Sequence, residues 1–382
     1  MLAANGGFFM AWSFRLFDVA GTAVRIHFTF FLLLAWIGAA HWMRGGPAEA
    51  IDGVLFIVIL FLCVLLHEFG HVFAARRYGI KTPDVTLLPI GGVASLERMP
   101  EKPSQEIVVA LAGPAVNLVI ALVLMLVLGA RFDLSQMAQL EQAQSTLTAR
   151  VAAANMTLLL FNLIPAFPMD GGRVLRALLA VPLGYTRATR TAAGIGQALA
   201  IVFALIGLFG NPLLMLVAVF IFLAASGEAG YVQARDYMRG YLARQAMISA
   251  YQTLSPAATA DDAAALLLRT TQQEFPIVDD RGALRGMLTR KDLIAGLTER
   301  GGATLVSDLM KDVPKVRESA CLDSVFPMLQ RPPGLVGVVD AQDRLIGYLS
   351  SENLAELIMI KSSRATAAAT PSSAVPVAGH TR

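Results

Sequence analysis

Long apolar runs alternate with short polar segments over the first 230 residues of the chain. The runs cover residues 26–43, 53–75, 107–129, 151–169 and 191–227. A helix that crosses a bilayer needs about 20 residues, and the last run is much longer than that. Gly210-Asn211-Pro212 divides it with residues that favour a turn. The pattern therefore predicts six transmembrane helices.

Basic residues gather in alternate loops between these runs. Arg and Lys are frequent before the first span, between the second and third, between the fourth and fifth, and after the sixth. The opposite loops carry only Arg44, Arg131 and Arg150. Because basic loops remain on the cytoplasmic side, we expect both termini to be cytoplasmic. The polar end of the second span, HEFGH at 67–71, is then expected on the same side.

The character of the chain changes near residue 245. Residues 274–297 and 335–358 each read as a β run, a polar turn, a second β run and a helix, at an offset of about 60. Two copies of one supersecondary unit usually pack together. We therefore expect a membrane domain over 1–244 and a cytoplasmic α/β pair. The predicted boundaries are 245–306 for the first copy, 307–361 for the second, and 362–382 for a low-complexity tail expected to be disordered.

Composition agrees with a membrane protein. Of the 382 residues, 55% are hydrophobic and 15% charged, against about 25% charged in an average soluble domain. A net charge of +3 gives no reason to expect nucleic acid as a partner. Two distant cysteines, Cys63 and Cys321, exclude a disulfide framework. The N-terminus has no convincing cleavage site, so we expect the first apolar span to be retained.

Three polar groups at the end of the second span carry the clearest chemical signal. His67 and His71 lie four residues apart, on one face of a helix, where two imidazoles can hold one metal ion beside Glu68. Inserting an ionisable residue within a membrane span costs about 2.5–3.5 kcal/mol of free energy. A cluster of such residues therefore indicates a function. Cys63 shares this face; we interpret it as a small apolar residue, with metal ligation as the alternative.

A hydrolytic zinc site takes three protein ligands and keeps one position for water. Among the remaining histidines, His380 is in the tail and His41 is near the opposite membrane face, which leaves His27 and the carboxylates. The best candidate is Asp170, in NLIPAFPMDGGR at 162–173, where two prolines break the helix. Unwound backbone at membrane depth is tolerated only in protein or beside a water-filled cavity. The alternative is a solvated Asp at a helix-ending turn.

These motifs together resemble the site-2 protease family of intramembrane zinc metalloproteases. HEFGH on a membrane helix and NLIPAFPMDGG about 100 residues later carry the resemblance, which covers roughly residues 15–230. VRIHFTF, LLPIGGVASL and GPAVNL are similar to supporting motifs of the first core helix, a membrane-dipping hairpin and the third helix. The resemblance implies that His67, His71 and Asp170 bind zinc and that Glu68 is the catalytic acid/base. It also implies that Asn162 binds or polarises the substrate.

The hairpin region also has a physical interpretation. Residues 85–96 are apolar, contain Gly91-Gly92 and are too short to cross the bilayer. A β edge there could pair with an unwound substrate segment, so Gly91 and Gly92 are candidate substrate-binding residues. The alternative is a plain interfacial loop.

The C-terminal repeats resemble a tandem pair of CBS domains over about 247–361. The family's nucleotide pattern is a Gly, a Ser or Thr three residues on, and an Asp three further; the two copies supply Gly286, Thr289, Asp292 and Gly347, Ser350, Asn353. The second copy departs from the pattern, since Asn replaces Asp. The resemblance implies adenine nucleotide binding, and the alternative is a structural module that forms a homodimer.

The sequence therefore predicts a polytopic α-helical membrane protein of the cell membrane, with six transmembrane helices, a membrane-dipping β-hairpin and a cytoplasmic α/β CBS pair. The expected activity is zinc-dependent cleavage of a transmembrane segment of a single-span protein, with one Zn²⁺ per chain and modulation by a CBS ligand. The rival is a CBS-regulated metal transporter that uses the histidines as a transit site. A Glu beside paired His, and an unwound DGG turn, favour hydrolysis.

Overall fold

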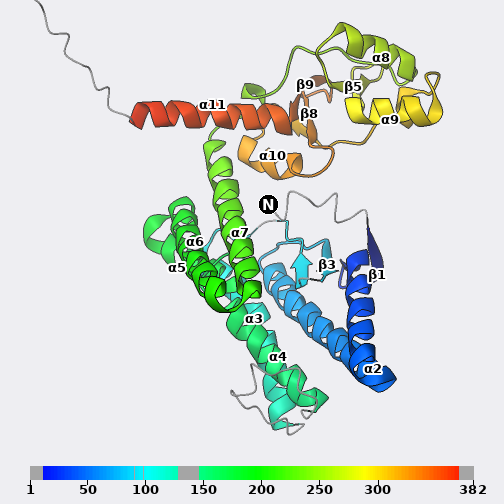
Figure 1. Ribbon diagram of the computed structural model, residues 1–382. Helices are drawn as coiled ribbons and strands as arrows, with labels where there is room; N and C mark the ends of the chain where they lie inside the picture. Colours follow the sequence, from blue (N-terminus) through cyan, green and yellow to red (C-terminus); the bar gives the residue numbers. More distant parts are fainter. Residues whose placement is uncertain (1–11, 90, 98, 128–145, 370–382) are drawn as a thin grey trace, which may run out of the picture. The chain divides into compact units, whose positions relative to one another are not determined.

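The computed structural model describes residues 12–89, 91–97, 99–127 and 146–369. The chain divides into two compact units, Met1–Val232 and Gln233–Arg382. The first holds the apolar helices and a small sheet, and the second holds the repeated α/β region (Figure 1).

The first long helix, α2 (Phe28–Arg76), contains the first two predicted spans. The His27 side chain accepts a hydrogen bond from the Thr29 amide and caps its N-terminus. The helix breaks at Gly46, whose φ of 78° lies in the left-handed region, and Pro47 follows. A proline cannot donate to the helical ladder, so the two halves are separate helices. The predicted gap between the first two spans is therefore found here.

The other helices of unit 1 follow the predicted runs, apart from the helix at residues 170–183, which lies between the fourth run and the fifth. They are α3 (Pro103–Leu126), α4 (Leu147–Asn162), α5 (Asp170–Leu183), α6 (Tyr185–Gly210) and α7 (Pro212–Tyr237). Asn211 separates the last two, as the turn signal predicted. Within the described residues, α2, α3, α6 and α7 are long and apolar enough to cross a bilayer.

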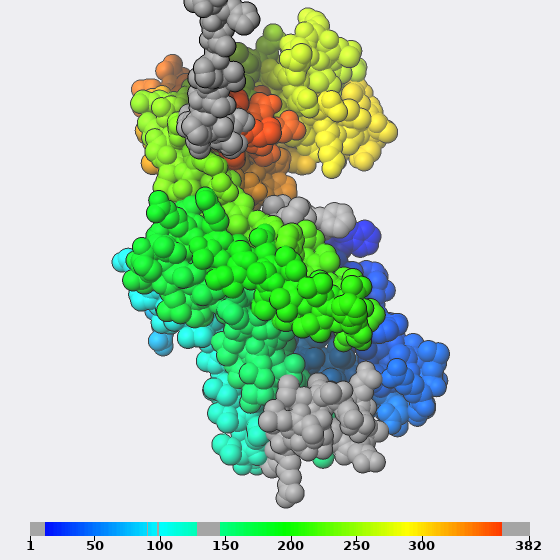
Figure 2. All heavy atoms as spheres, turned by 60° about the vertical axis from the view of Figure 1, so that its left-hand side comes forward, coloured from blue at the N-terminus to red at the C-terminus, as the bar shows by residue number. Residues whose placement is uncertain are grey.

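Helices α6 and α7 form part of the green band across one face of unit 1 (Figure 2). They expose large apolar side chains, including Ile201, Leu205, Leu208, Phe209, Leu216 and Leu223. Apolar surface on this scale marks an interaction with another apolar phase. For a helix of this length, that phase is the lipid of a membrane.

A four-stranded sheet lies against α2. Its strands are β1 (Ser13–Val19), β2 (Thr22–His27), β3 (Asp84–Leu88) and β4 (Gly91–Ala94), in the order β1-β2-β3-β4. β3 and β4 are antiparallel over the segment for which the sequence predicted a hairpin, whereas β2 and β3 are parallel. Val24 and Val85 of the sheet pack with Phe61, Phe69 and Val72 of α2. This packing places β4 beside the HEFGH turns.

The two copies in unit 2 repeat one another. The first has α8 (Ala260–Arg269), β5 (Glu274–Val278), β6 (Leu284–Thr289) and α9 (Arg290–Arg300); the second has β7 (Lys315–Arg317), α10 (Leu322–Leu329), β8 (Leu335–Val339), β9 (Leu345–Ser350) and α11 (Ser351–Ala369). In each copy an Asp, Asp279 or Asp340, closes the turn between two antiparallel strands by accepting backbone hydrogen bonds.

The copies also interlock. Ile248, at the start of the first copy, bridges to Tyr348 in β9 of the second, and Lys311, at the start of the second copy, bridges to Met287 in β6 of the first. Helix α11 includes residues 362–369 of the segment predicted as a disordered tail; its alanines favour helix. The rest of that segment, 370–382, lies outside the described residues.

Candidate metal centre and active site

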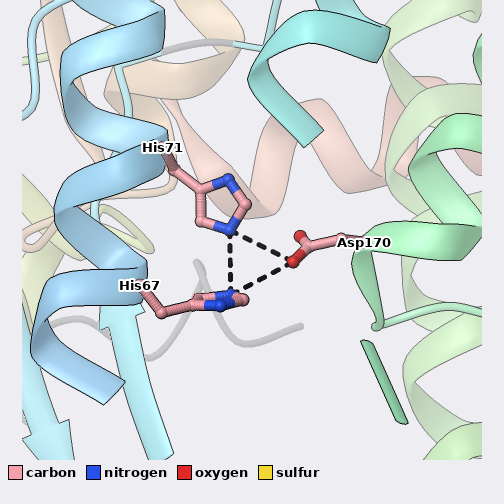
Figure 3. A group of neighbouring side chains, drawn as sticks. All are labelled: His67, His71 and Asp170. Carbon is pink, nitrogen blue, oxygen red and sulfur yellow. Dashed lines mark hydrogen bonds and ion pairs between the residues drawn. The ribbon is translucent and has the colours of Figure 1, made fainter. Parts of the chain in front are cut away.

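Three ligand atoms from two helices converge inside unit 1 (Figure 3). The Nε2 atoms of His67 and His71 are 3.1 Å apart. The Oδ2 atom of Asp170 lies 3.2 Å from the first and 3.1 Å from the second. All three residues are buried. Residues 67, 71 and 170 are thus brought together as the sequence predicted.

The tautomer of His71 is fixed by a neighbour on α3. Its Nδ1 atom lies 2.7 Å from the backbone oxygen of Val109. A carbonyl oxygen can only accept, so Nδ1 is the donor, and Nε2 of the neutral ring presents a lone pair to the centre of the cluster. This is the outer hydrogen bond that metal-bound histidines normally make.

Asp170 is presented by an unwound segment between α4 and α5. It is the first residue of α5, after the loop 163–169. The two glycines that follow are needed for close packing: a Cβ on Gly171 would lie 2.3 Å from the Leu163 oxygen, and one on Gly172 would lie 2.6 Å from the carbonyl carbon of Ala166. The DGG sequence therefore lets the start of α5 lie directly on the preceding loop.

The cluster fits a zinc ion. With Zn–N distances of about 2.0–2.1 Å, tetrahedral geometry places two ligand nitrogens about 3.3 Å apart, close to the observed spacing. The space before the ligands is kept open by Gly113 of α3, where a Cβ would lie 2.3 Å from Nε2 of His71 and 2.6 Å from Nε2 of His67. Two imidazole nitrogens and a carboxylate oxygen are an ordinary ligand set for zinc.

Glu68 lies on the other side of the same helical turn, against the edge strand. A Cβ on Gly92 of β4 would lie 2.6 Å from Cγ and 3.2 Å from Oε1 of Glu68. Gly91, with φ of 134°, adopts a conformation that side chains rarely tolerate. Gly92 therefore lets the strand approach Glu68, and Gly91 lets the backbone adopt its left-handed conformation next to it.

The remaining predicted residues are placed as follows. Asn162 is the last residue of α4, immediately before the loop that leads to Asp170. His27 is not part of the metal cluster; it caps α2, with Nδ1 2.7 Å from the Thr29 hydroxyl. Sequence reasoning missed the roles of Gly113 and Val109, although GPAVNL marked the helix that carries them.

In the first C-terminal copy, the candidate nucleotide residues are engaged with one another. The Thr289 hydroxyl donates to Asp292 Oδ2 at 2.7 Å, and Lys311 Nζ lies 2.6 Å from Asp292 Oδ1. Gly286 permits the close passage of residues 310–311, since a Cβ there would lie 2.9 Å from the sulfur of Met310.

In the second copy, the backbone N–H of Asn353 donates to the hydroxyl of Ser350, which is buried. The Oδ1 atom of Asn353 is buried and has no hydrogen-bond partner in the described part of the chain. Gly347 matches Gly286, since its absent Cβ would meet Met247, 2.7 Å from the sulfur. The two copies therefore share a backbone arrangement but differ in charge.

Comparison with known proteins identifies two families. The model of peptidase family M50 matches residues 55–206, and that of the CBS domain matches residues 243–299. A zinc metalloprotease of Methanocaldococcus jannaschii is 35% identical over 280 residues, which cover 73% of this chain and 78% of that protein. Stage IV sporulation protein FB of Bacillus subtilis is 30% identical over 168 residues, 44% of this chain and 52% of that protein.

Among solved structures, the site-2 protease from Methanocaldococcus jannaschii is 37% identical, covers 57% of this chain and 95% of that chain, and has a TM-score of 0.43. The chain is a metalloprotease with apolar helices long enough to span a membrane. It belongs to peptidase family M50, the site-2 proteases, and carries a CBS domain. The family predicted from the sequence is confirmed.

Proposed function

We propose that the protein cuts transmembrane segments of single-span membrane proteins, with one zinc ion per chain held by His67, His71 and Asp170. The observation that carries this proposal is the approach of β4 to Glu68. β4 is an edge strand of its sheet, and its outer edge pairs with no strand in the described residues. An extended peptide can add to such an edge by main-chain hydrogen bonds.

The roles of the residues follow from their positions. A substrate helix hides its peptide bonds, so a segment must be extended before water can attack; Gly91 and Gly92 let the edge that would hold it lie beside Glu68. Zinc held by this cluster would act as a Lewis acid toward water and the peptide carbonyl. Glu68 takes the proton of the attacking water and returns it to the leaving amide nitrogen. Asn162, at the end of α4, orients the substrate backbone.

We further propose six membrane crossings with both termini cytoplasmic. Supporting this, α2 is divided at Gly46, and α3, α6 and α7 are each long and apolar enough to cross a bilayer. The 16-residue α4 is the remaining proposed crossing. Reporter fusions at residues 48 and 140 should be external, and fusions at 90, 182 and 300 internal. An external signal at 300 would contradict this topology.

The C-terminal pair is proposed to bind an adenine nucleotide and to tune access to the zinc site. Its support is the Thr289–Asp292 arrangement at the start of α9, together with the CBS family match. A ligand changes activity only through different affinities for two states, typically 5- to 150-fold. In a purely structural role, the same pair would instead form a homodimer and show no response to nucleotide.

The cleavage proposal is tested by membrane proteomics that compares cells with wild-type protein and with Glu68→Gln. Single-span stubs should accumulate in the variant, because it keeps the metal ligands and loses the proton carrier. The rival transporter predicts no stubs and a change in cellular zinc. Stubs in equal amounts in both cells would contradict the proposal.

A further inference from the structure

The largest fully buried side chain of unit 1 is a cation, Arg176 of α5, which is 0% exposed. Its Nε atom donates to Oε1 of Glu106 in α3 at 2.7 Å, and its Nη1 atom donates to Oε1 of Glu228 in α7 at 2.5 Å. The guanidinium also lies over two aromatic rings, 5.1 Å from the centroid of Phe167 and 4.9 Å from that of Tyr185. One side chain therefore joins α5 to three other helices, α3, α6 and α7, and to the loop before Asp170.

A buried ion pair of this kind is poor evidence for stability alone. The desolvation of two charges largely cancels their attraction, and apolar residues of similar volume often serve as well. What a planar guanidinium supplies is direction, since its donors point along fixed lines, Nε toward Glu106 and Nη1 toward Glu228. The position of Arg176 in relation to the metal ligands is therefore the informative feature.

Both residues of the Arg176–Glu106 pair lie on helices that form or contact the metal cluster. On α3, Glu106 lies three residues before Val109, whose oxygen accepts from His71, and seven before Gly113, which faces both histidines. On a helix these spacings share one face. On α5, Arg176 lies six residues after Asp170. The pair thus joins the helix that orients His71 to the helix that begins with Asp170.

Arg176 also contacts the loop that leads to Asp170. Phe167, under the guanidinium, lies three residues before Asp170 and is buried. Arg173, between Asp170 and Arg176 on α5, places Nη1 3.8 Å from Oδ1 of Asp170. The Asp170 carboxylate therefore faces the histidines with Oδ2 and a cation with Oδ1.

We propose that Arg176 is a positioning residue that sets the distance between Asp170 and the two histidines and thereby the affinity for zinc. This inference rests on the proposed zinc ligands. Glu106 is the partner that fixes α5 against α3. Glu228, whose side chain is 36% exposed, fixes α5 against α7 and is the outer half of the cluster.

The inference is tested by zinc affinity, measured by competition with a chelating dye on the purified full-length chain in detergent. Arg176→Gln should raise the zinc Kd about 10- to 100-fold, the usual cost of removing a group that orients a metal ligand. Arg176→Lys should recover little of it, because an ammonium keeps the charge but not the fork. Glu106→Gln is the second variant, and it should act in the same direction.

The matched control is Arg150, another interhelical cation. Its Nη1 atom lies 2.5 Å from Oδ2 of Asp52, and its guanidinium lies 4.6 Å from the centroid of Phe56. Asp52 and Phe56 lie on α2 at least 11 residues before His67, and Arg150 lies 20 residues before Asp170. This pair is therefore remote from the metal cluster, and Arg150→Gln should lower the melting temperature without changing the zinc Kd.

A result in which Arg176→Gln and Arg150→Gln both lower the melting temperature, with an unchanged zinc Kd, would overturn the inference and leave Arg176 a structural residue. Asp170→Ala separates this failure from failure of the proposed site. If Asp170→Ala loses zinc and Arg176→Gln does not, only the positioning role is wrong. If Asp170→Ala keeps its zinc, the ligand set itself is wrong, and the positioning role falls with it.

Discussion

Gly113 of α3 faces His71 of α2 so closely that a Cβ at this position would lie 2.3 Å from the Nε2 atom. Nothing but hydrogen fits there beside the two ring nitrogens. The helix that carries Gly113 also fixes the tautomer of His71 through the Val109 oxygen. The space for the metal is therefore defined by α3 as much as by HEFGH itself.

This contact predicts the effect of a single methyl group. Gly113→Ala should abolish zinc binding and cleavage together, because the methyl group would occupy the space before both Nε2 atoms. Zinc content by mass spectrometry and cleavage of a model substrate are the measurements. Gly194→Ala in α6 is the control, since a Cβ there meets nothing within 4 Å; it should keep zinc and activity. Full zinc content in Gly113→Ala would show that the metal lies elsewhere.

A substitution at Gly92 should affect the catalytic step without affecting metal binding. Gly92→Ala places a methyl group 2.6 Å from Cγ of Glu68 and should displace its carboxylate by a fraction of an ångström or more. A misplacement of about 1 Å can cost on the order of 100-fold in rate. We therefore expect a fall of this size in kcat with full zinc content. Unchanged kcat would argue against Glu68 as the proton carrier beside β4.

Nucleotide binding should depend on the first CBS copy. In the purified chain, ATP or AMP should bind and change the rate of cleavage, and Thr289→Ala with Asp292→Ala should remove the response and keep basal cleavage. Lys311→Ala releases Asp292 from its ion pair and should alter nucleotide affinity while zinc content stays constant. Equilibrium dialysis measures the binding. If wild-type protein binds neither nucleotide, the pair is a docking or dimerisation module.

Two carboxylates in the repeat turns should make unit 2 sensitive to acid. Backbone hydrogen bonds, from Ala283 to Asp279 and from Arg344 to Asp340, lower the pKa of each carboxyl below its ordinary value of 3.8. A lowered folded-state pKa adds stability above the unfolded-state value, and this stability is lost as the pH falls through the folded-state pKa.

The melting temperature, measured by circular dichroism, should therefore fall at pH values below about 4. The double variant with Asp279→Asn and Asp340→Asn should show a smaller fall. Asp280→Asn, beside the first turn, is the control and should leave the fall as it is in the wild type. An identical pH profile in the double variant would show that these turns do not contribute to acid sensitivity.

Much of the site could be predicted because its chemistry is local in sequence. His67 and His71 share a face because of the helical repeat alone, and the prolines and glycines around Asp170 predict an unwound segment. The break between α6 and α7 at Asn211, and the repeat of the C-terminal turns, were also visible as patterns. Each of these features depends on residues a few positions apart.

The parts that could not be predicted depend on tertiary contacts. The sequence does not predict β1 and β2. In β2, Thr22 and Val24 are buried and alternate with the half-buried Ala23 and Arg25, but the alternation stops there, since Ile26 is half-buried and His27 is buried. The buried contact of Arg176 with Glu106 joins residues 70 positions apart, and no local pattern indicates it.

The central claim is that the buried cluster and Glu68 hydrolyse a peptide bond within a membrane segment. The most direct test reconstitutes the purified chain with a single-span model substrate in lipid vesicles and identifies the products by mass spectrometry. The account predicts a cut inside the apolar segment by the wild type, and none by Glu68→Gln with its zinc retained. A cut outside the apolar segment, or equal cleavage by zinc-loaded Glu68→Gln, would contradict it.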